Sequence, residues 1–204
     1  EVAYITGKSI RSALAFGMFF AAVFIAFGDG WGNAFYHSDA AGEYLRVLAP
    51  IVPLIYLDVV VDSLLKGMDE QFNSMKYNFS DSLIRVILIL CFLRFFGMES
   101  YVCILFFSTI FNAALSLHRL LKVTNVCLSL GWHVLLPLLC AVLSVSLGSY
   151  LLRGVTLSNL FFQIGLETLV CGLFFGAGYY ALCRVSDGKA IRKKGKSSLR
   201  EDLP

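Results

Sequence analysis

Six apolar stretches, each about as long as a membrane-crossing helix, follow one another along the 204-residue chain and constrain its fold. A helix needs roughly 20 mostly apolar residues to cross the hydrocarbon core of a bilayer. The composition agrees, because 58% of the residues are hydrophobic and 15% are charged, whereas soluble domains are about 45–50% apolar and about 25% charged. The sequence therefore predicts an all-α, polytopic membrane helix bundle. Its expected transmembrane helices are residues 9–28, 41–66, 72–96, 100–121, 126–152 and 157–183.

Lysine and arginine are distributed unevenly between the two sides of this predicted bundle. Thirteen of them fall on the side that holds both chain ends, three on the other side and one within a span. Cytoplasmic loops carry the excess of positive charge. We therefore expect a multi-pass protein of the cell membrane with both ends of this chain cytoplasmic. Residues 185–204 are expected to be a disordered basic tail, which either touches anionic lipid or only anchors the topology.

Five charged residues interrupt the second and third apolar stretches at four-residue spacing. Asp58, Asp62 and Lys66 share one helical face, as do Asp81 and Arg85. With a rise of about 1.5 Å per residue, Asp58 and Arg85 lie at similar depth in antiparallel helices, so we expect them to pair. Ionisable residues in a membrane usually face a partner or a water-filled cavity. The cluster is therefore either a structural lock between the two helices or a site for a cation or a lipid headgroup.

Other residues in the apolar stretches are candidates for a functional site. Pro50 and Pro53 are expected to bend the second helix, because proline breaks the backbone hydrogen-bond pattern. Gln163 and Glu167 lie four residues apart in the last helix, and Glu167 has no cation in its own span. Together with Asn112 in the fourth helix, they are predicted to line a cavity or groove.

The sequence carries no motif of covalent chemistry. The six cysteines include no C-x-x-C pair, the three histidines match no metal-ligand spacing, and no phosphate-binding loop or nucleophile elbow is present. We therefore expect no metal, no cofactor, no nucleic-acid partner and no enzymatic activity. Two rival interpretations are a membrane-embedded enzyme of lipid metabolism, which the scattered histidines disfavour, and a non-transporting membrane scaffold.

Two stretches of the chain carry a resemblance to a known family. They are "YLRVLAPIVPLIYLDVVVDSLLKGMDEQFNSMKYNFSDSLIRV" and "ILFFSTIFNAALSLHRLLKVT". The Leu-Ala-Pro, Tyr-Leu-Asp, Leu-Lys-Gly, Tyr-Asn and Leu-x-x-Arg-Leu elements resemble the polysaccharide flippases of the multidrug/oligosaccharidyl-lipid/polysaccharide exporter superfamily. They look closest to the branch that contains stage V sporulation protein B and the lipid II flippases. The chain departs from the pattern at Asp69, where the family more often has a small residue.

The resemblance implies the C-terminal part of a fourteen-helix, two-lobe flippase. Residues 1–124 would be four helices of the second lobe, 125–184 two additional helices, and 185–204 the cytoplasmic tail. The implied function is flipping of a lipid-linked saccharide or cell-wall precursor across the cytoplasmic membrane. The implied partners are membrane lipid, the polyprenyl-linked substrate and a missing N-terminal lobe. The alternative within the superfamily is a multidrug/cation antiporter.

Overall fold

The computed structural model describes residues 2–124, 134–152 and 160–201, and in these residues all regular structure is helical. Six α-helices and one turn of 3₁₀ helix follow one another. Their bounds are α1 Val2–Tyr36, α2 Asp39–Leu48, η1 Ala49–Ile51, α3 Val52–Gly67, α4 Gln71–Thr124, α5 Leu136–Leu152 and α6 Leu160–Glu201.

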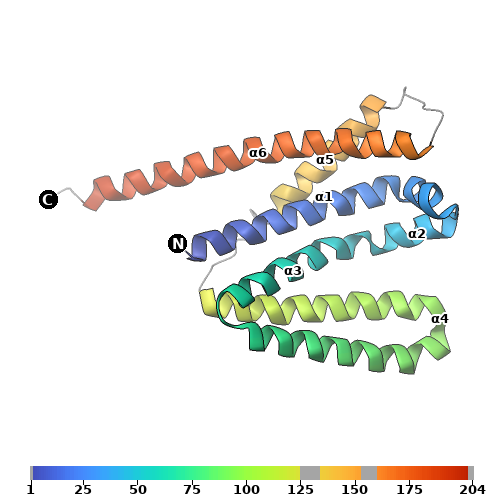
Figure 1. Ribbon diagram of the computed structural model, residues 1–204. Helices are drawn as coiled ribbons and strands as arrows, with labels where there is room; N and C mark the ends of the chain where they lie inside the picture. The colour runs from blue at the N-terminus through green and yellow to red at the C-terminus, as the bar shows by residue number, and fades with distance from the viewer. Residues whose placement is uncertain (1, 125–133, 153–159, 202–204) are drawn as a thin grey trace.

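Helix α1 lies in the middle of the bundle (Figure 1) and packs against α2, α3, α5 and α6. On one side, α2 and α3 run back along α1, and α4 packs against α3. On the other side, α5 and α6 pack against each other and against α1. The central position is reflected in burial, because Ile10, Ala15 and Val23 of α1 are at most 1% exposed.

Four of the described helical segments are long and apolar enough to cross a membrane, which supports the prediction of a membrane protein. They are Tyr4–Tyr36, Asp39–Gly67, Glu99–Thr124 and Phe161–Leu182. The sequence predicts six. The expected third span carries Lys76, Asp81, Arg85 and Arg94, and charge at membrane depth is costly. The fifth is the apolar helix α5, which has 17 residues; residues 126–133 of that expected span lie outside the described residues.

The polar, glycine-rich segment after residue 28 was expected to be a long connection, and this is wrong. Helix α1 continues to Tyr36, and the connection to α2 is His37 and Ser38. The glycines serve helix packing instead. A Cβ atom at Gly32 would lie 2.6 Å from the Cα of Gly42, so the two backbones approach as closely as small residues permit. Asp29 and Arg46 form an ion pair of 2.6 Å across the same contact.

Pro50 and Pro53 lie where the second predicted helix is interrupted. Pro50 is the central residue of η1, and Pro53 occupies the first turn of α3, where the missing N–H costs no helical hydrogen bond. Helix α1 fits closely against this break. A Cβ atom at Gly17 would lie 2.6 Å from the Cα of Pro53.

Helix α4 contains both the third and the fourth predicted helices, separated at Gly97, whose φ of 66° and ψ of −148° are not helical. It folds into a hairpin with a first arm, residues 71–96, and a second arm, residues 98–124 (Figure 1). We call the end at Gly97 the kink end. The opposite end, at the turn between α3 and α4, is the turn end.

Helix α6 also differs from expectation. The tail from residue 185 was expected to be disordered, but α6 continues as a helix to Glu201. Once a membrane-crossing helix has formed, each further residue adds a hydrogen bond without a new nucleation step. The polar segment can therefore extend the helix.

Candidate functional site

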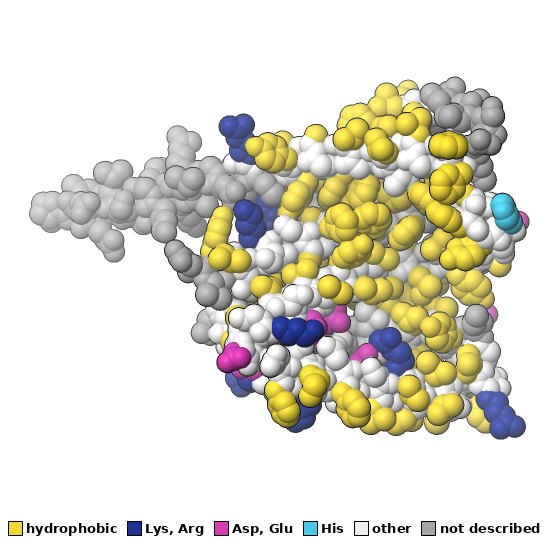
Figure 2. Space-filling model, in the orientation of Figure 1, with side chains coloured by type: hydrophobic (Ala, Val, Ile, Leu, Met, Phe, Trp, Pro, Cys, Tyr) yellow, Lys and Arg dark blue, Asp and Glu magenta, His cyan; other side chains and the backbone are white. Residues whose placement is uncertain are grey.

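Polar side chains meet where α3 packs against the two arms of α4. Figure 2 shows acidic and basic side chains side by side on this part of an otherwise largely hydrophobic face. Each helix contributes residues spaced three or four apart, which places them on one helical face. We call this set the polar cluster. Its members are Asp58, Asp62, Lys66, Ser74, Asn78, Asp81, Arg85, Ser108, Asn112 and Ser116.

The layer of the cluster nearest the kink end joins the two arms of α4. Arg85 Nη2 donates to Asp81 Oδ2 at 2.8 Å, and Arg85 Nε donates to Ser108 Oγ at 2.9 Å. Ser108 in turn donates to Asp81 Oδ1. Asp81 is 5% exposed and Ser108 is 1% exposed. A buried carboxylate thus has both a counter-ion from its own helix and a donor from the other arm.

The middle layer joins α3 to both arms through amide groups. Asn112 Nδ2 donates to Asp58 Oδ2 at 2.8 Å and to Asn78 Oδ1 at 3.2 Å. The Ser116 hydroxyl also lies beside the Asp58 carboxyl group. Asn112 is therefore the point at which α3 and the two arms of α4 are held together.

The next layer centres on Asp62. Its carboxylate accepts hydrogen bonds from Lys66 Nζ at 2.6 Å, from Asn78 Nδ2 at 3.1 Å and from the Ser74 hydroxyl. Ser74 is 1% exposed, whereas 57% of the Lys66 side chain is exposed. The cluster therefore runs from a buried interior to an exposed cation.

The turn end is joined by an ion pair between Glu70, in the turn that connects α3 to α4, and Arg119 of the second arm. Arg119 Nη2 donates to both carboxylate oxygens of Glu70 at 2.9 Å, and Arg119 Nε donates to Oε2 at 3.3 Å. Asn73 donates to the same carboxylate. The hydrogen bonds from Asn73 and Arg119 hold the pKa of the Glu70 carboxyl group below its ordinary value.

The expected ion pair between Asp58 and Arg85 is wrong. Arg85 pairs with Asp81, one turn away on the same arm, and Asp58 accepts a hydrogen bond from Asn112 instead. Depth along a helix does not determine rotation about its axis, so two residues at equal depth can face different neighbours.

Sequence reasoning did not identify Ser74, Asn78, Ser108 and Ser116 as members of the cluster. One signal was available in the sequence. Ser108, Asn112 and Ser116 repeat at intervals of four residues in an apolar helix, as Asp58, Asp62 and Lys66 do in α3.

Two buried oxygen atoms in the middle layer have no hydrogen-bond partner among the residues that the structure describes. They are Asp58 Oδ1 and Asn112 Oδ1. Buried polar atoms are nearly always hydrogen-bonded, so an exception needs an explanation. A carboxylate or amide oxygen can accept a hydrogen bond from a donor group or contact a hard cation. Within the described residues, no group of three His, Cys, Asp or Glu side chains could hold a metal ion.

Gln163 and Glu167 lie apart from the polar cluster, on α6. Gln163 Nε2 donates to Glu167 Oε1 at 3.3 Å, within one turn of the helix. Helix α6 packs against α1 and α5. That these two residues line a cavity or groove stays a prediction, whereas the third candidate, Asn112, lies in the polar cluster.

An apolar cavity of about 420 Å³ lies between α1, α5 and the break at the start of α3. Pro50 and Pro53 line it on one side, and Leu138 and Val142 of α5 line it on another. The break in the second helix therefore borders an apolar space.

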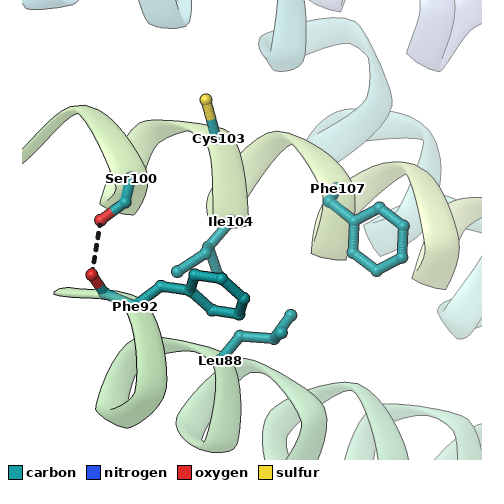
Figure 3. A pocket seen from close by; sticks show the side chains of 6 residues that line it. All are labelled: Leu88, Phe92, Ser100, Cys103, Ile104 and Phe107. Carbon is teal, nitrogen blue, oxygen red and sulfur yellow. Dashed lines mark hydrogen bonds between the residues drawn. The ribbon is translucent and has the colours of Figure 1, made fainter. Parts of the chain in front are cut away.

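A second apolar cavity, of about 350 Å³, is lined by residues of both arms of α4 near the kink end. In Figure 3, Leu88 and Phe92 of the first arm face Ile104 of the second. Ser100 donates to the Phe92 carbonyl at 3.5 Å and to the Gly97 carbonyl at 2.7 Å, so its hydroxyl is used by the backbone of the kink. Among the described residues, no side-chain ion pair or amide contact joins the two arms in this part of the hairpin.

Fold and site together define a helical protein with several apolar helices of membrane-crossing length and a buried polar cluster. Comparison with known proteins finds no match to a family model, to a curated protein or to a solved structure.

Proposed function

We propose that this chain is part of a transporter that flips a lipid-linked saccharide across the cytoplasmic membrane. The observation that carries the proposal is the polar cluster, in which carboxylates, amides and cations lie within apolar helices. Such groups are expensive in a bilayer and usually mark a pathway for a polar substrate. The resemblance of residues 44–86 and 104–124 to polysaccharide flippases points in the same direction.

A lipid-linked saccharide has two parts that need different surroundings. The saccharide needs hydrogen-bonding groups, which the polar cluster supplies. The lipid chain needs an apolar surface, which the exposed hydrophobic side chains on the outer faces of the helices supply. We propose that the headgroup crosses along the cluster, by alternating access together with an N-terminal lobe, while the lipid chain stays in an apolar environment. No covalent step is required.

Flipping by the reconstituted full-length transporter, in which this chain is joined to the proposed N-terminal lobe, tests this proposal. Proteoliposomes would carry a fluorescent polyprenyl diphosphate–N-acetylglucosamine in both leaflets, and an impermeant reductant would bleach the outer leaflet. We expect the transporter to render the inner-leaflet probe accessible, and Asn112→Leu to abolish this effect when flipping is compared per molecule of folded protein. Phe107→Leu, near the kink end, is the matched control and should flip normally. A protected inner-leaflet probe in the presence of wild-type protein would contradict the proposal.

The proposed orientation places both chain ends and the turn between α3 and α4 in the cytoplasm, with the connection between α1 and α2 outside. In a variant without the native cysteines, an impermeant thiol reagent added outside cells should label Ser38→Cys and not Asp69→Cys. The reverse pattern would contradict the orientation. Asp69 is the suitable position because Ser74, also near this turn, is buried.

A cation-coupled antiporter is the second candidate, and the unpartnered oxygens of Asp58 and Asn112 favour it. Two oxygens without donors are available to a proton or a cation. An imposed sodium or proton gradient should then change the transport rate, and Asp58→Asn should remove that dependence while leaving the fold intact. A rate that is independent of both gradients would exclude this candidate.

A further inference from the structure

The first arm of α4 carries an exposed apolar stripe on the face opposite its polar residues. The spacing of its members is three or four residues throughout, so they share one side of the helix. Each is between 52% and 73% exposed. The stripe is about 27 Å long at 1.5 Å per residue, close to the roughly 30 Å of a bilayer core. Its members are Phe72, Met75, Phe79, Leu83, Val86 and Leu90.

A cavity of about 520 Å³ opens at the turn end of this stripe. Phe72 and Met75 belong to both the stripe and the cavity lining, so the two surfaces are continuous. The remaining lining residues are polar. They are Lys66, Gln71, Ser74 and Asn78. An apolar surface therefore leads directly into a hydrogen-bonding cavity.

The polar lining suits a neutral polyhydroxyl group better than a phosphate. The charge of Lys66 is matched by Asp62 at 2.6 Å, and Asp62 also orients Ser74 and Asn78. Gln71 is exposed and offers both an amide donor and an amide acceptor. Donors and acceptors are thus balanced, and the cation in the lining is already neutralised. Phe72, 70% exposed, can contact the C–H face of a sugar ring.

A cation outside the cavity lies beside the stripe. Lys76 is exposed and one helical turn beyond Phe72, and the structure gives it no ion-pair partner among the described residues. A phosphate that joins a sugar to a lipid would find a complementary charge there. Sugar, phosphate and hydrocarbon would then follow one another from the cavity, past Lys76, onto the stripe.

We propose that this cavity and stripe bind one lipid-linked saccharide, with a sugar ring against Gln71 and Phe72 and the lipid chain along the first arm of α4. The inference rests on the proposed function, since it names where the substrate first docks. The proposed site differs from a surface that only faces bulk lipid, because binding at the site requires a contribution from the sugar.

Binding to this chain in lipid nanodiscs tests the proposal with two radiolabelled probes. One is farnesyl diphosphate–N-acetylglucosamine, and the other is farnesyl diphosphate without the sugar. We expect the sugar-bearing probe to bind more tightly. Gln71→Ala should weaken its binding about fivefold, the value of one lost hydrogen bond, and leave the other probe unchanged. Lys76→Ala should weaken both probes. Phe72→Ala should weaken only the sugar-bearing probe.

Matched controls separate these effects from general changes. Phe162→Ala on α6 and Lys122→Ala at the end of α4 remove an exposed residue of the same type and should leave both affinities unchanged. Equal affinity for the two probes, or a sugar-bearing probe that is insensitive to Gln71→Ala, would overturn the proposal.

Failure of this site and failure of the proposed function give different results. If wild type flips the substrate and Gln71→Ala changes neither binding nor flipping, the docking site is wrong and the function stands. If Gln71→Ala selectively weakens the sugar-bearing probe but wild type does not flip it, the site stands and the function is wrong.

Discussion

The two ends of the α4 hairpin differ in what joins their arms. From the turn end to Ser108, ion pairs and amide contacts link the two arms to each other and to α3. At the kink end, residues of both arms line an apolar cavity of about 350 Å³. Lipid tails are as apolar as leucine, so apolar contact between membrane helices brings little hydrophobic gain. The polar cluster, more than apolar burial, therefore holds this hairpin together.

The largest effect is expected from Arg85→Ala. This change removes the counter-ion of the buried Asp81 and the contact to Ser108. Leaving a buried charge without its partner costs about 3–5 kcal/mol. Because the Arg85 side chain is 39% exposed, we expect Arg85→Ala to lower the free energy of unfolding by about 2–3 kcal/mol. The measurement is the free energy of unfolding in detergent. Phe107→Ala, at the kink end and 58% exposed, is the control. Equal losses for the two variants would remove the contrast between the ends.

A smaller effect is expected from Gly97→Ala at the kink. A Cβ atom there would meet no other atom within 4 Å, but the φ of 66° is unfavourable for alanine. The cost of such a backbone is about 1–3 kcal/mol, so the melting temperature in detergent should fall. Gly165→Ala, in open space within α6, should leave it unchanged or raise it slightly. A neutral Gly97→Ala would mean that the kink does not require this conformation.

The smallest effect is expected from Glu70→Gln at the turn end, where the ion pair with Arg119 is partly exposed. The pKa of Glu70 is lowered in the folded protein. Its contribution to stability is therefore present above the ordinary carboxyl pKa of 4.5 and is lost as the pH falls through the lower folded value. Unfolding followed from neutral to acid pH should show this loss in wild type and not in Glu70→Gln. Identical pH profiles would argue against the ion pair.

Much of the fold follows from the sequence, because apolar runs of helical length and charged residues at four-residue spacing are local patterns. The polar faces of α3, with Asp58 and Asp62, and of α4, with Asp81 and Arg85, were predicted in this way; α3 contacts the first arm of α4 through Asp62, Ser74 and Asn78. The partners were not predicted correctly, because Asn112 approaches from the second arm and the rotation of a helix is set by packing. The segment around Gly32 was expected to connect two spans, whereas in this bundle it is helical and its glycine allows α1 and α2 to approach.

The central claim is that Arg85 secures the hairpin through Asp81 on its own arm and Ser108 on the other, and not through Asp58. Two double-mutant cycles in the free energy of unfolding test it most directly. One combines Arg85→Ala with Asp81→Asn, and the other combines Arg85→Ala with Asp58→Asn. We predict a coupling energy of at least about 1 kcal/mol in the first cycle and additivity within about 0.5 kcal/mol in the second. Strong coupling between Arg85 and Asp58, with none between Arg85 and Asp81, would contradict the account.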